Sequence, residues 1–571
     1  MIAVAAVAAV VLGAAGLGTW GVRFARTTSD LFVASRAVTP WWNAAAISGE
    51  YLSAASFLGI AGLEMKLGAG ALWLPIGFTA GYLSLLLFVA APLRRFGSYT
   101  IPDFAETRLS SAGLRSLAAV VVLAIAGFYL VPQLKGAGIA LRQVTGAPYW
   151  VGVGTVGLIV SGYVALGGMR GVTYVQAFQF WVKTFAIALP ACLLLIHLGG
   201  LPARAALFGD DLPRAPARGL VVKIDSPQKV EFPAATDYRI AGRAAHARAG
   251  DKVTLPRGRL ALPPHAAVPV ANGTTAKTGR EWSRPVTSGG GSSPLFVYSL
   301  LVATLLGTMG LPHILVRFYT NRDGPAARRT TVRVLGLLGL FYLFPCVYGA
   351  LGRVLTPGLY VTGSTDTVVL RLPHAAWPGA GGDVLGALVA AGAFAAFMST
   401  ASGLLVSIAG TTSYDILGRT AGPHARRTRF RAVAAIGMLP PALLALAARS
   451  IDISVLVGWA FALAASTFCP MFLLGIWWTR LTARGAAAGM AAGATVASGL
   501  IFAGLIRGER TDVLGALLAQ PAVLSVPVAF LTMIGVSLLD GRVPTDVREQ
   551  MLALHAPENL GLEQQLAPVE A

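Results

Sequence analysis

The sequence predicts an all-α membrane protein of about thirteen transmembrane helices. Of its 571 residues, 55% are hydrophobic and only 12% are charged, and the mean hydropathy is +0.68. Apolar runs long enough to cross a hydrocarbon core of ~30 Å recur along the chain, and short connections that carry arginine separate them. A transmembrane barrel would instead alternate apolar and polar residues. The pattern therefore indicates a helical bundle.

The apolar runs define the helices that we expect. Their boundaries are accurate to a few residues only. The expected ranges are 2–22, 40–62, 71–92, 115–140, 149–167, 173–199, 294–319, 332–355, 383–413, 431–448, 452–477, 484–506 and 513–538.

Basic residues predict the orientation of the bundle. No basic residue precedes the run from Ile2 to Trp20, whereas Arg23 and Arg26 follow it. This polarity favours a retained first helix with its N-terminus outside over a signal peptide. With an odd number of helices, the C-terminus then lies inside. The predicted inner connections contain Arg94, Arg95, Arg108, Arg115, Arg170, Arg317, Arg322, Arg328, Arg329, Arg333, Arg419, Arg426, Arg427, Arg429, Arg431, Arg480 and Arg484, and the short outer ones contain few, such as Lys66, Arg353 and Arg371.

The net charge is +20, and we interpret it as a result of the arginines in the connections between spans, which set the orientation of the bundle. No aromatic and basic surface segment accompanies it, so we predict no nucleic-acid partner. Cys192, Cys346 and Cys469 lie in predicted spans without metal-ligand spacing, which disfavours disulfides and a zinc site. The chain lacks an HExxH motif, a GxSxG elbow and a phosphate loop, so we predict neither an enzyme nor a bound cofactor.

The chain divides into six predicted parts. They are a first helix and loop (1–30), a first block of five helices (31–199), a polar insertion (200–293), a second block of five helices (294–480), two last helices (481–540) and a cytoplasmic tail (541–571). The insertion is rich in Pro, Arg and Gly and contains alternating stretches such as VVKIDSPQKVEF. We expect it to form a small β-rich lid on the outer side.

The second predicted helix, WWNAAAISGEYLSAASFLGIAG, places Gly49 and Glu50 in mid-span. A glycine there weakens the helix and allows carbonyl oxygens to turn toward a ligand, so we expect local unwinding at Gly49. Small residues also form tight helix interfaces, which is the simpler alternative. Glu50 favours a functional role, because an ionisable group inside a membrane faces a partner or a polar cavity. Lys135 and Lys183 are the candidate partners for its carboxylate.

The seventh predicted helix, SLLVATLLGTMGLPHILVRFYT, is also interrupted. Gly307, Thr308 and Gly310 precede Pro312, which removes a backbone donor and favours a break. Each interrupted helix opens a block of about five spans. This placement predicts inverted repeats with a binding site between the broken segments.

The segment AAGAFAAFMSTASGLLVSIAG contains a third set of polar groups. Ser399 and Thr400 follow Ala396 at three and four positions, so the three residues share one helical face. Two hydroxyls and a carbonyl are hard oxygen ligands, which suit a hard cation such as Na+. Alternatively, the hydroxyls bond to carbonyls of the preceding turn.

Five strings, SGEYLSAASFLG, FYLVPQLKGAG, LGGMRGVTYVQAFQ, GTMGLPHILVRFYT and AFMSTASGLL, occur in this order between about residues 30 and 480. Together they resemble the sodium:solute symporter family, and most closely its cation/acetate symporter branch. The resemblance implies a leucine-transporter-type fold in which helices 2–6 and 7–11 form inverted five-helix repeats. It also implies alternating access to a central site.

The resemblance implies a sodium site as well. Its ligands would be the backbone carbonyls of Gly49, Leu52 and Ala396 and the hydroxyls of Ser399 and Thr400.

Residues that face the solute follow from the same resemblance. They are Ser53, Ser56, Gln133 and Thr308. Many family members carry Asp where this chain has Gln176, a departure that is shared by the acetate-like branch and removes a carboxylate that assists sodium passage. Lys135 either pairs with Glu50 or attracts an anionic solute.

The resulting hypothesis is a symporter of the inner membrane that couples Na+ entry to uptake of a short-chain monocarboxylate such as acetate. Three alternatives stay open: a proton as the coupling ion, with Glu50 as the titrating group; proline or a sugar as the solute; and a solute sensor. The short tail argues against the sensor, because no kinase-like domain follows the last helix.

Overall fold

The computed structural model describes residues 1–556, apart from residues 22–37, 97, 99, 203, 272–273, 275, 287–292, 418–421, 508–512 and 545. Four features of the sequence analysis lie outside the described residues: Arg23, Arg26, Arg419 and the tail beyond residue 556.

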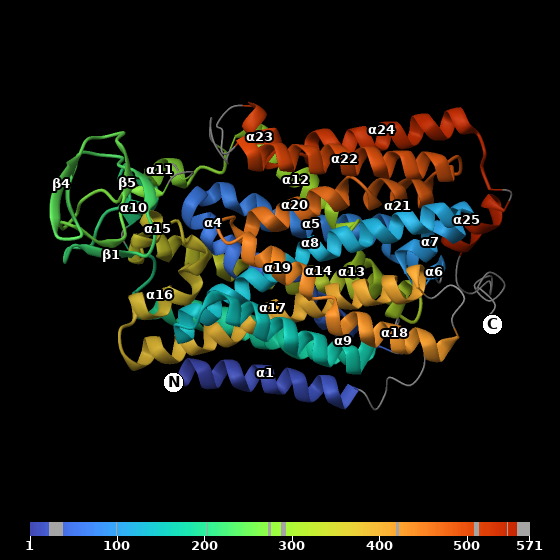
Figure 1. Cartoon of the computed structure of the whole chain (residues 1–571), viewed down its shortest axis with the longest axis horizontal. Helices are drawn as coiled ribbons and strands as arrows, with labels where there is room; N and C mark the ends of the chain where they lie inside the picture. The colour runs from blue at the N-terminus through green and yellow to red at the C-terminus, as the bar shows by residue number, and fades with distance from the viewer. Residues whose placement is uncertain are drawn as a thin grey trace.

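Long helices run side by side along the long axis of the molecule (Figure 1). Within the described residues, eleven helical stretches are long and apolar enough to cross a membrane. Large apolar side chains such as Leu158, Phe185 and Leu531 are exposed on the outside of the bundle, as contact with lipid requires. The chain is a multi-pass membrane protein.

Among the described residues, ten helical elements precede the insertion, and two of them are short turns that are not α-helical. They are α1 (Ile2–Trp20), α3 (Pro40–Tyr51), α4 (Ile60–Leu67), α5 (Trp73–Phe88), α6 (Ala90–Phe96), α7 (Ile101–Leu109), α8 (Ala112–Thr145), α9 (Tyr149–His197), the π-helix η3 (Ala55–Gly59) and the 3-10 helix η4 (Gly68–Leu72).

The helices after the insertion are α12 (Pro294–Thr308), α13 (Pro312–Val316), η6 (Arg317–Thr320), α14 (Gly324–Leu355), α15 (Gly358–Thr362), η7 (Thr365–Thr367), α16 (Val368–Ala376), α17 (Ala380–Thr411), η8 (Thr412–Ile416), α18 (Pro423–Ile436), α19 (Leu439–Ala447), α20 (Ile453–Ala465), α21 (Phe468–Trp477), α22 (Ala483–Arg507), α23 (Val513–Ala519), α24 (Ala522–Asp540) and α25 (Val547–His555). Every one of the predicted ranges overlaps one or more of these helices.

The number of continuous helices differs from the prediction because chain direction changes without a loop. The 49 residues of α9 contain the predicted helix 149–167 and all but the last two residues of the predicted helix 173–199, and Gly168 between them has φ 56° and ψ −161°. Only glycine adopts such angles without strain, so Gly168 makes the kink. The stretch Ala55–Phe88 likewise joins the end of the second predicted helix to the third.

Both predicted helix breaks exist, but the first lies later than expected. Helix α3 is regular through Gly49 and ends at Tyr51, so the predicted unwinding at Gly49 is wrong by three residues. In the seventh predicted helix, α12 ends at Thr308 and α13 begins at Pro312. Pro312 takes the first helical position, where its missing N–H is no loss.

The insertion contains the β structure of the molecule, in seven described strands: β1 (Leu220–Ile224), β2 (Gln228–Glu231), β3 (Thr236–Ile240), β4 (Arg243–Ala247), β5 (Lys252–Leu255), β6 (Gly258–Leu262) and β7 (Val270–Ala271). They form a four-stranded sheet in the order β1-β6-β3-β4 and a three-stranded sheet in the order β5-β2-β7. The described pairings are antiparallel, with Val222 opposite Leu260 and Val230 opposite Val253. Two short helices, α10 (Arg204–Phe208) and α11 (Gly279–Trp282), flank the strands.

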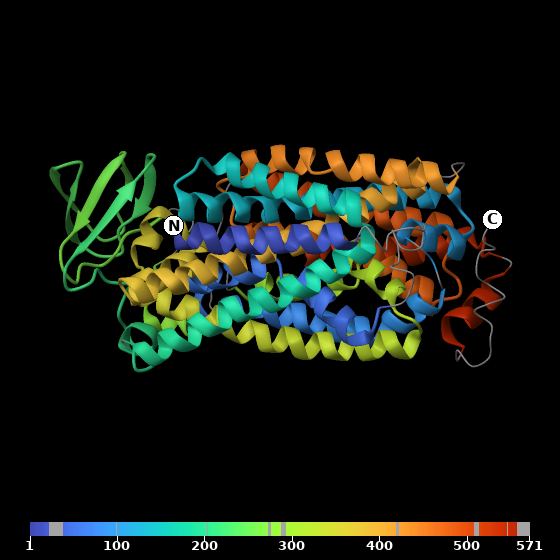
Figure 2. The same cartoon turned by 90° about the horizontal axis from the view of Figure 1, so that it is seen from below.

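Helix α14 anchors the insertion to the bundle. Arg353 donates hydrogen bonds to the carbonyls of Ala206 (2.9 Å) and Lys277 (2.7 Å) and stacks over the ring of Trp282. Figure 2 shows the strands projecting from the end of the bundle at which α1 begins. We call this the insertion end.

The opposite end carries α25 and the short helices α6 and α7 (Figure 1). Arg95 donates to the carbonyl of Leu554, and Arg108 bonds to Gly475 and Gln550 there. These arginines belong to the predicted inner set. Their position at the C-terminal end agrees with the predicted orientation, which stays a prediction.

Candidate functional site

The break after α3 exposes backbone oxygens in the middle of the bundle. The bond from Leu52 N to Ser48 O (3.0 Å) is the last of the helix. Beyond it, the Ala54 amide donates to Gln133 Oε1 (2.9 Å) and the Ala55 amide to Ser53 Oγ (3.2 Å). Because these amides turn away, carbonyls of the last helical turn accept hydrogen bonds from side chains of other helices.

Helix α17 supplies two of those side chains. Ser399 Oγ lies 2.6 Å from Gly49 O and 3.0 Å from Ala396 O, and Thr400 Oγ1 lies 2.5 Å from Glu50 O. Both hydroxyls are fully buried. The alternative of bonding only within their own helix therefore does not describe them, since each reaches across to α3.

The ammonium group of Lys183 lies among these oxygens. Its Nζ is 2.6 Å from Leu52 O and 2.9 Å from Ser399 Oγ, and it also donates to Gly49 O. Lys183 is completely buried on the second half of α9, which packs against both α3 and α17. The sequence predicts Lys183 as a candidate partner for Glu50. The structure places it within the predicted set of sodium ligands.

The carboxylate of Glu50 pairs with Arg317 instead, at 2.6 Å between Nε and Oε2. Arg317 opens η6 just after the break in the seventh predicted helix, and it also donates to Thr173 Oγ1 (2.7 Å) and Gln176 Oε1. Of the two alternatives for Lys135, the pairing with Glu50 is wrong, because Lys135 donates to the carbonyl of Ile451. Arg317 belongs to the predicted inner set of arginines, and its closeness to Pro312 is the one feature of the sequence that points to a role in the site.

Gln176 makes hydrogen bonds with both ends of its side-chain amide. Its Nε2 donates to Ser399 O (2.8 Å) and Ser402 Oγ (3.2 Å), and its Oε1 accepts from Arg317. An aspartate has no donor for α17. The amide thus joins the Glu50 and Arg317 pair to the helix that carries Ser399.

The four predicted solute residues surround one cluster of aromatic side chains. Gln133 contacts the α3 break as described above. The hydroxyl of Thr308 lies 2.8 Å from that of Tyr51, Ser56 lies 3.1 Å from Tyr342, and Ser53 lies 3.5 Å from Tyr129. Because Tyr51 comes from α3 and Thr308 from the end of α12, this contact joins the two broken helices.

The cluster is closed in this conformation. Ser53, Ser56, Gln133 and Thr308 are at most 1% exposed. Rings of Tyr51 and Tyr82 lie 4.6 Å apart edge to face, and the centroids of Phe78 and Phe461 are 4.8 Å apart. A solute therefore enters only after these side chains separate.

Polar contacts tie the helices together at both ends of this closed region. At the insertion end, Lys66 pairs with Asp452 (2.7 Å) and Asp366 accepts from the Ile453 amide (3.1 Å). At the C-terminal end, Asn321 bonds to Asn43 (3.0 Å) and Thr330 (2.8 Å).

A cavity of about 1050 Å³ lies at the insertion end, between β1, α15 and the end of α8. Five basic side chains and one carboxylate, that of Asp225, are among its lining residues. The basic ones are Arg142, Arg218, Lys223, Arg371 and Arg449. We call this cavity the basic vestibule.

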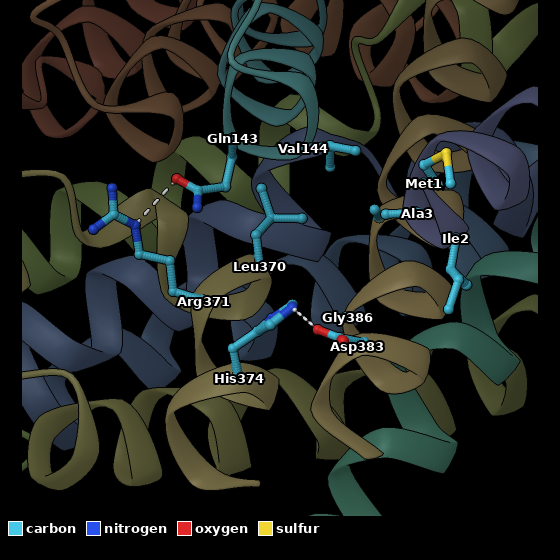
Figure 3. A pocket seen from close by; sticks show the side chains of 11 residues that line it. Met1, Ile2, Ala3, Gln143, Val144, Leu370, Arg371, His374, Asp383 and Gly386 are labelled. Atoms are coloured by element: carbon cyan, nitrogen blue, oxygen red, sulfur yellow. Dashed lines mark hydrogen bonds and ion pairs between the residues drawn. The ribbon is translucent and has the colours of Figure 1, made fainter. Parts of the chain in front are cut away.

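A smaller cavity of about 370 Å³ adjoins the vestibule and shares Arg371 and His374 with it. Figure 3 shows His374 pointing toward Asp383, at 3.1 Å, and Arg371 toward Gln143, at 3.2 Å. The first residues of α1 close its other side.

The sequence matches that of known transporters over most of its length. A sequence profile described as the sodium:solute symporter family matches residues 31–211 and 270–493. The uncharacterized symporter YwcA of Bacillus subtilis (strain 168) is 30% identical over 521 residues, which cover 89% of this chain and 88% of that protein.

Among solved structures, the chain is similar to a Na+-coupled sialic acid symporter in a substrate-bound, outward-open state. The TM-score is 0.67 at 14% identity, and the match covers 94% of this chain and 98% of the other. At this identity, the likeness concerns the fold.

Proposed function

Since the chain belongs to the sodium:solute symporter family, we propose that the solute it moves with Na+ is a short-chain monocarboxylate such as acetate. The basic vestibule is the observation that supports a negatively charged solute, because its lining has five cationic side chains and one carboxylate. Clefts lined by charge of one sign concentrate ligands of the other sign. The central cluster is closed, so the proposed transport needs a change of conformation that opens it to one side of the membrane at a time, which is alternating access.

The sodium position of the proposal lies between the α3 break and α17. The carbonyls of Gly49, Leu52 and Ala396 and the hydroxyl of Ser399 converge there, and Thr400 fixes the adjoining carbonyl of Glu50. All are uncharged oxygens, which suit a hard monovalent cation. Na+ is cargo here, so the set has to release it as well as bind it.

The solute position of the proposal is the aromatic cluster beside the same break. Hydroxyls of Tyr51, Tyr129, Thr308 and Ser53 gather there. Thr308 donates its hydrogen to Thr304 O (2.7 Å), so the donors for a carboxylate are the hydroxyls of the two tyrosines and Ser53. Because the rings of this cluster are closely packed, their separation opens a small space, and a small space favours a short acid. One Na+ moving with one monocarboxylate carries no net charge, so uptake follows the sodium gradient and is insensitive to membrane potential.

Uptake of labelled acetate into proteoliposomes tests the proposal. We expect an inward Na+ gradient to drive uptake of acetate, and unlabelled propionate and pyruvate to compete, whereas proline and glucose do not. Ser399→Ala with Thr400→Ala removes two hydroxyls from the sodium region, so the Na+ concentration for half-maximal uptake should rise at least about tenfold, as loss of about 1.4 kcal/mol predicts. Uptake by a proton gradient without Na+, or unchanged sodium dependence in the double variant, would contradict it.

The vestibule provides a second prediction, for solute affinity. Arg218→Glu with Lys223→Glu reverses two exposed charges at β1, so the apparent KM for acetate should rise several-fold at low ionic strength while the maximal rate stays unchanged. High salt should abolish the difference, because exposed charges are screened within ~10 Å at 0.1 M.

The matched control for this experiment is Arg243→Glu on β4, at the far edge of the same sheet and outside the vestibule lining. An equal rise of KM in the control, or none in the double variant, would show that the vestibule does not attract the solute.

A further inference from the structure

Lys183 Nζ has the surroundings expected of a bound cation. Its three contacts are the carbonyls of Gly49 and Leu52 and the hydroxyl of Ser399. Three acceptors match the three hydrogens of an ammonium group. No carboxylate is among them, and the carboxylate of Glu50 is held by Arg317. The amine is therefore coordinated by three of the neutral oxygens that the proposed sodium position uses.

We propose that Lys183 and Na+ are alternative occupants of this one position, and that Lys183 acts as a tethered cation that must withdraw before Na+ binds. The inference rests on the proposed sodium position. It adds a competitor that belongs to the chain itself, and it assigns Lys183 a role in setting the sodium affinity.

Exclusion follows from space and charge. A nitrogen 2.6 Å from Leu52 O and 2.9 Å from Ser399 Oγ fills the centre of the oxygen set, so a second ion has no room between them. Even beside that centre, an ammonium and a sodium ion repel each other strongly, since little water screens them at a fully buried site.

Withdrawal is compatible with the lysine side chain. Its four-carbon stem is flexible and ends in a compact group, so the nitrogen can change place without movement of the α9 backbone. While it is in place, Lys183 bridges α9, α3 and α17. It thereby holds the broken helix against its neighbours when Na+ is absent.

Sodium binding to the purified full-length protein tests this inference without a transport assay. The probe is NaCl, with choline chloride as the ionic control, and the readouts are direct binding of radioactive sodium and sodium-dependent thermal stabilisation. Lys183→Met keeps the apolar stem and removes the amine. We expect the half-saturating Na+ concentration to fall at least about tenfold, because in the parent the apparent dissociation constant equals the intrinsic one divided by the fraction of molecules in which the position is free.

Two further observations should accompany that shift. Without Na+, Lys183→Met should melt at a lower temperature than the parent, because three acceptors lose their donor. With Na+, it should gain more stability than the parent does. Lys183→Gln, which keeps two donors but no charge, should also bind Na+ more tightly, and it serves as the test if the methionine variant does not fold.

The matched control is Lys135→Met, which removes another buried lysine that donates to a carbonyl, that of Ile451. Its sodium affinity should stay within about twofold of the parent, well below the shift expected for a lost competitor. An equal gain in this control would assign the effect to the loss of any buried positive charge and would overturn the inference.

Ser399→Ala separates the two possible failures. If it leaves the sodium response unchanged in both the parent and Lys183→Met, the proposed sodium position is wrong. If Ser399→Ala weakens binding while Lys183→Met and Lys183→Gln do not tighten it, the sodium position holds and the tethered cation is wrong.

Discussion

Arg317→Met is expected to lower the free energy of unfolding by about 3–5 kcal/mol, since it leaves the carboxylate of Glu50 buried without its partner. Glu50 and Arg317 are at most 1% exposed and 2.6 Å apart. The variant also removes the hydrogen bonds that Arg317 donates to Thr173 Oγ1 and Gln176 Oε1. Reversible unfolding in mixed micelles, followed by tryptophan fluorescence, measures the loss.

The partner variant distinguishes loss of a pair from loss of packing. Glu50→Gln combined with Arg317→Met removes both charges, so the double variant should recover at least about 1.5 kcal/mol relative to Arg317→Met, a coupling typical of contacting charges. Arg328→Met, an exposed arginine at the C-terminal end, should stay within about 0.5 kcal/mol of the parent. If the single and double variants are equally unstable, the carboxylate does not depend on Arg317.

The two broken helices show how far local sequence determines this fold. Around Pro312 the break was predicted at the right place, because proline itself removes the donor and its effect is local. Around Gly49 the prediction missed by three residues. Just after the break there, the side chain of Gln133 accepts from the Ala54 amide, 79 positions away in the sequence. No local propensity contains that contact.

The charged residues of the site show a second limit. The positive-inside rule counts arginines in the connections between spans and says nothing about where a side chain turns. Arg317 follows an apolar run and so was assigned to an inner loop, although α13 and η6 carry it back to Glu50. The sequence identifies Lys183 as an ionisable group within the membrane, but it does not reveal the oxygens that Lys183 contacts. Its contacts come from two other helices, and only the tertiary structure joins them.

For the proposed sodium ligands, helical spacing and the family resemblance gave different kinds of information. Ser399 and Ala396 share a helical face, which spacing alone predicts. That this face meets the α3 break is a consequence of how α17 packs on α3 and α9. The resemblance supplied that packing, and the 2.6 Å contact between Ser399 Oγ and Gly49 O agrees with it.

Gly403→Ala is expected to abolish sodium-coupled uptake and to destabilise the protein by up to about 3 kcal/mol, the usual cost of overpacking a buried site. A Cβ at position 403 would lie 1.7 Å from Glu50 Oε1. The carboxylate has little freedom to move away, because its other oxygen is held by Arg317. Strain there reaches the sodium region directly, since the Glu50 carbonyl accepts from Thr400.

The sign of the effect makes this prediction specific. In a helix without a steric conflict, alanine in place of glycine stabilises by up to about 1 kcal/mol. Gly162 on α9 provides the control, because a Cβ there meets nothing within 4 Å. Gly162→Ala should therefore melt at or above the parent temperature, and Gly403→Ala below it, in the same thermal assay. A Gly403→Ala protein with unchanged melting temperature and uptake would mean that Glu50 does not rest against α17, and the arrangement of Glu50, Arg317 and Gln176 would need revision.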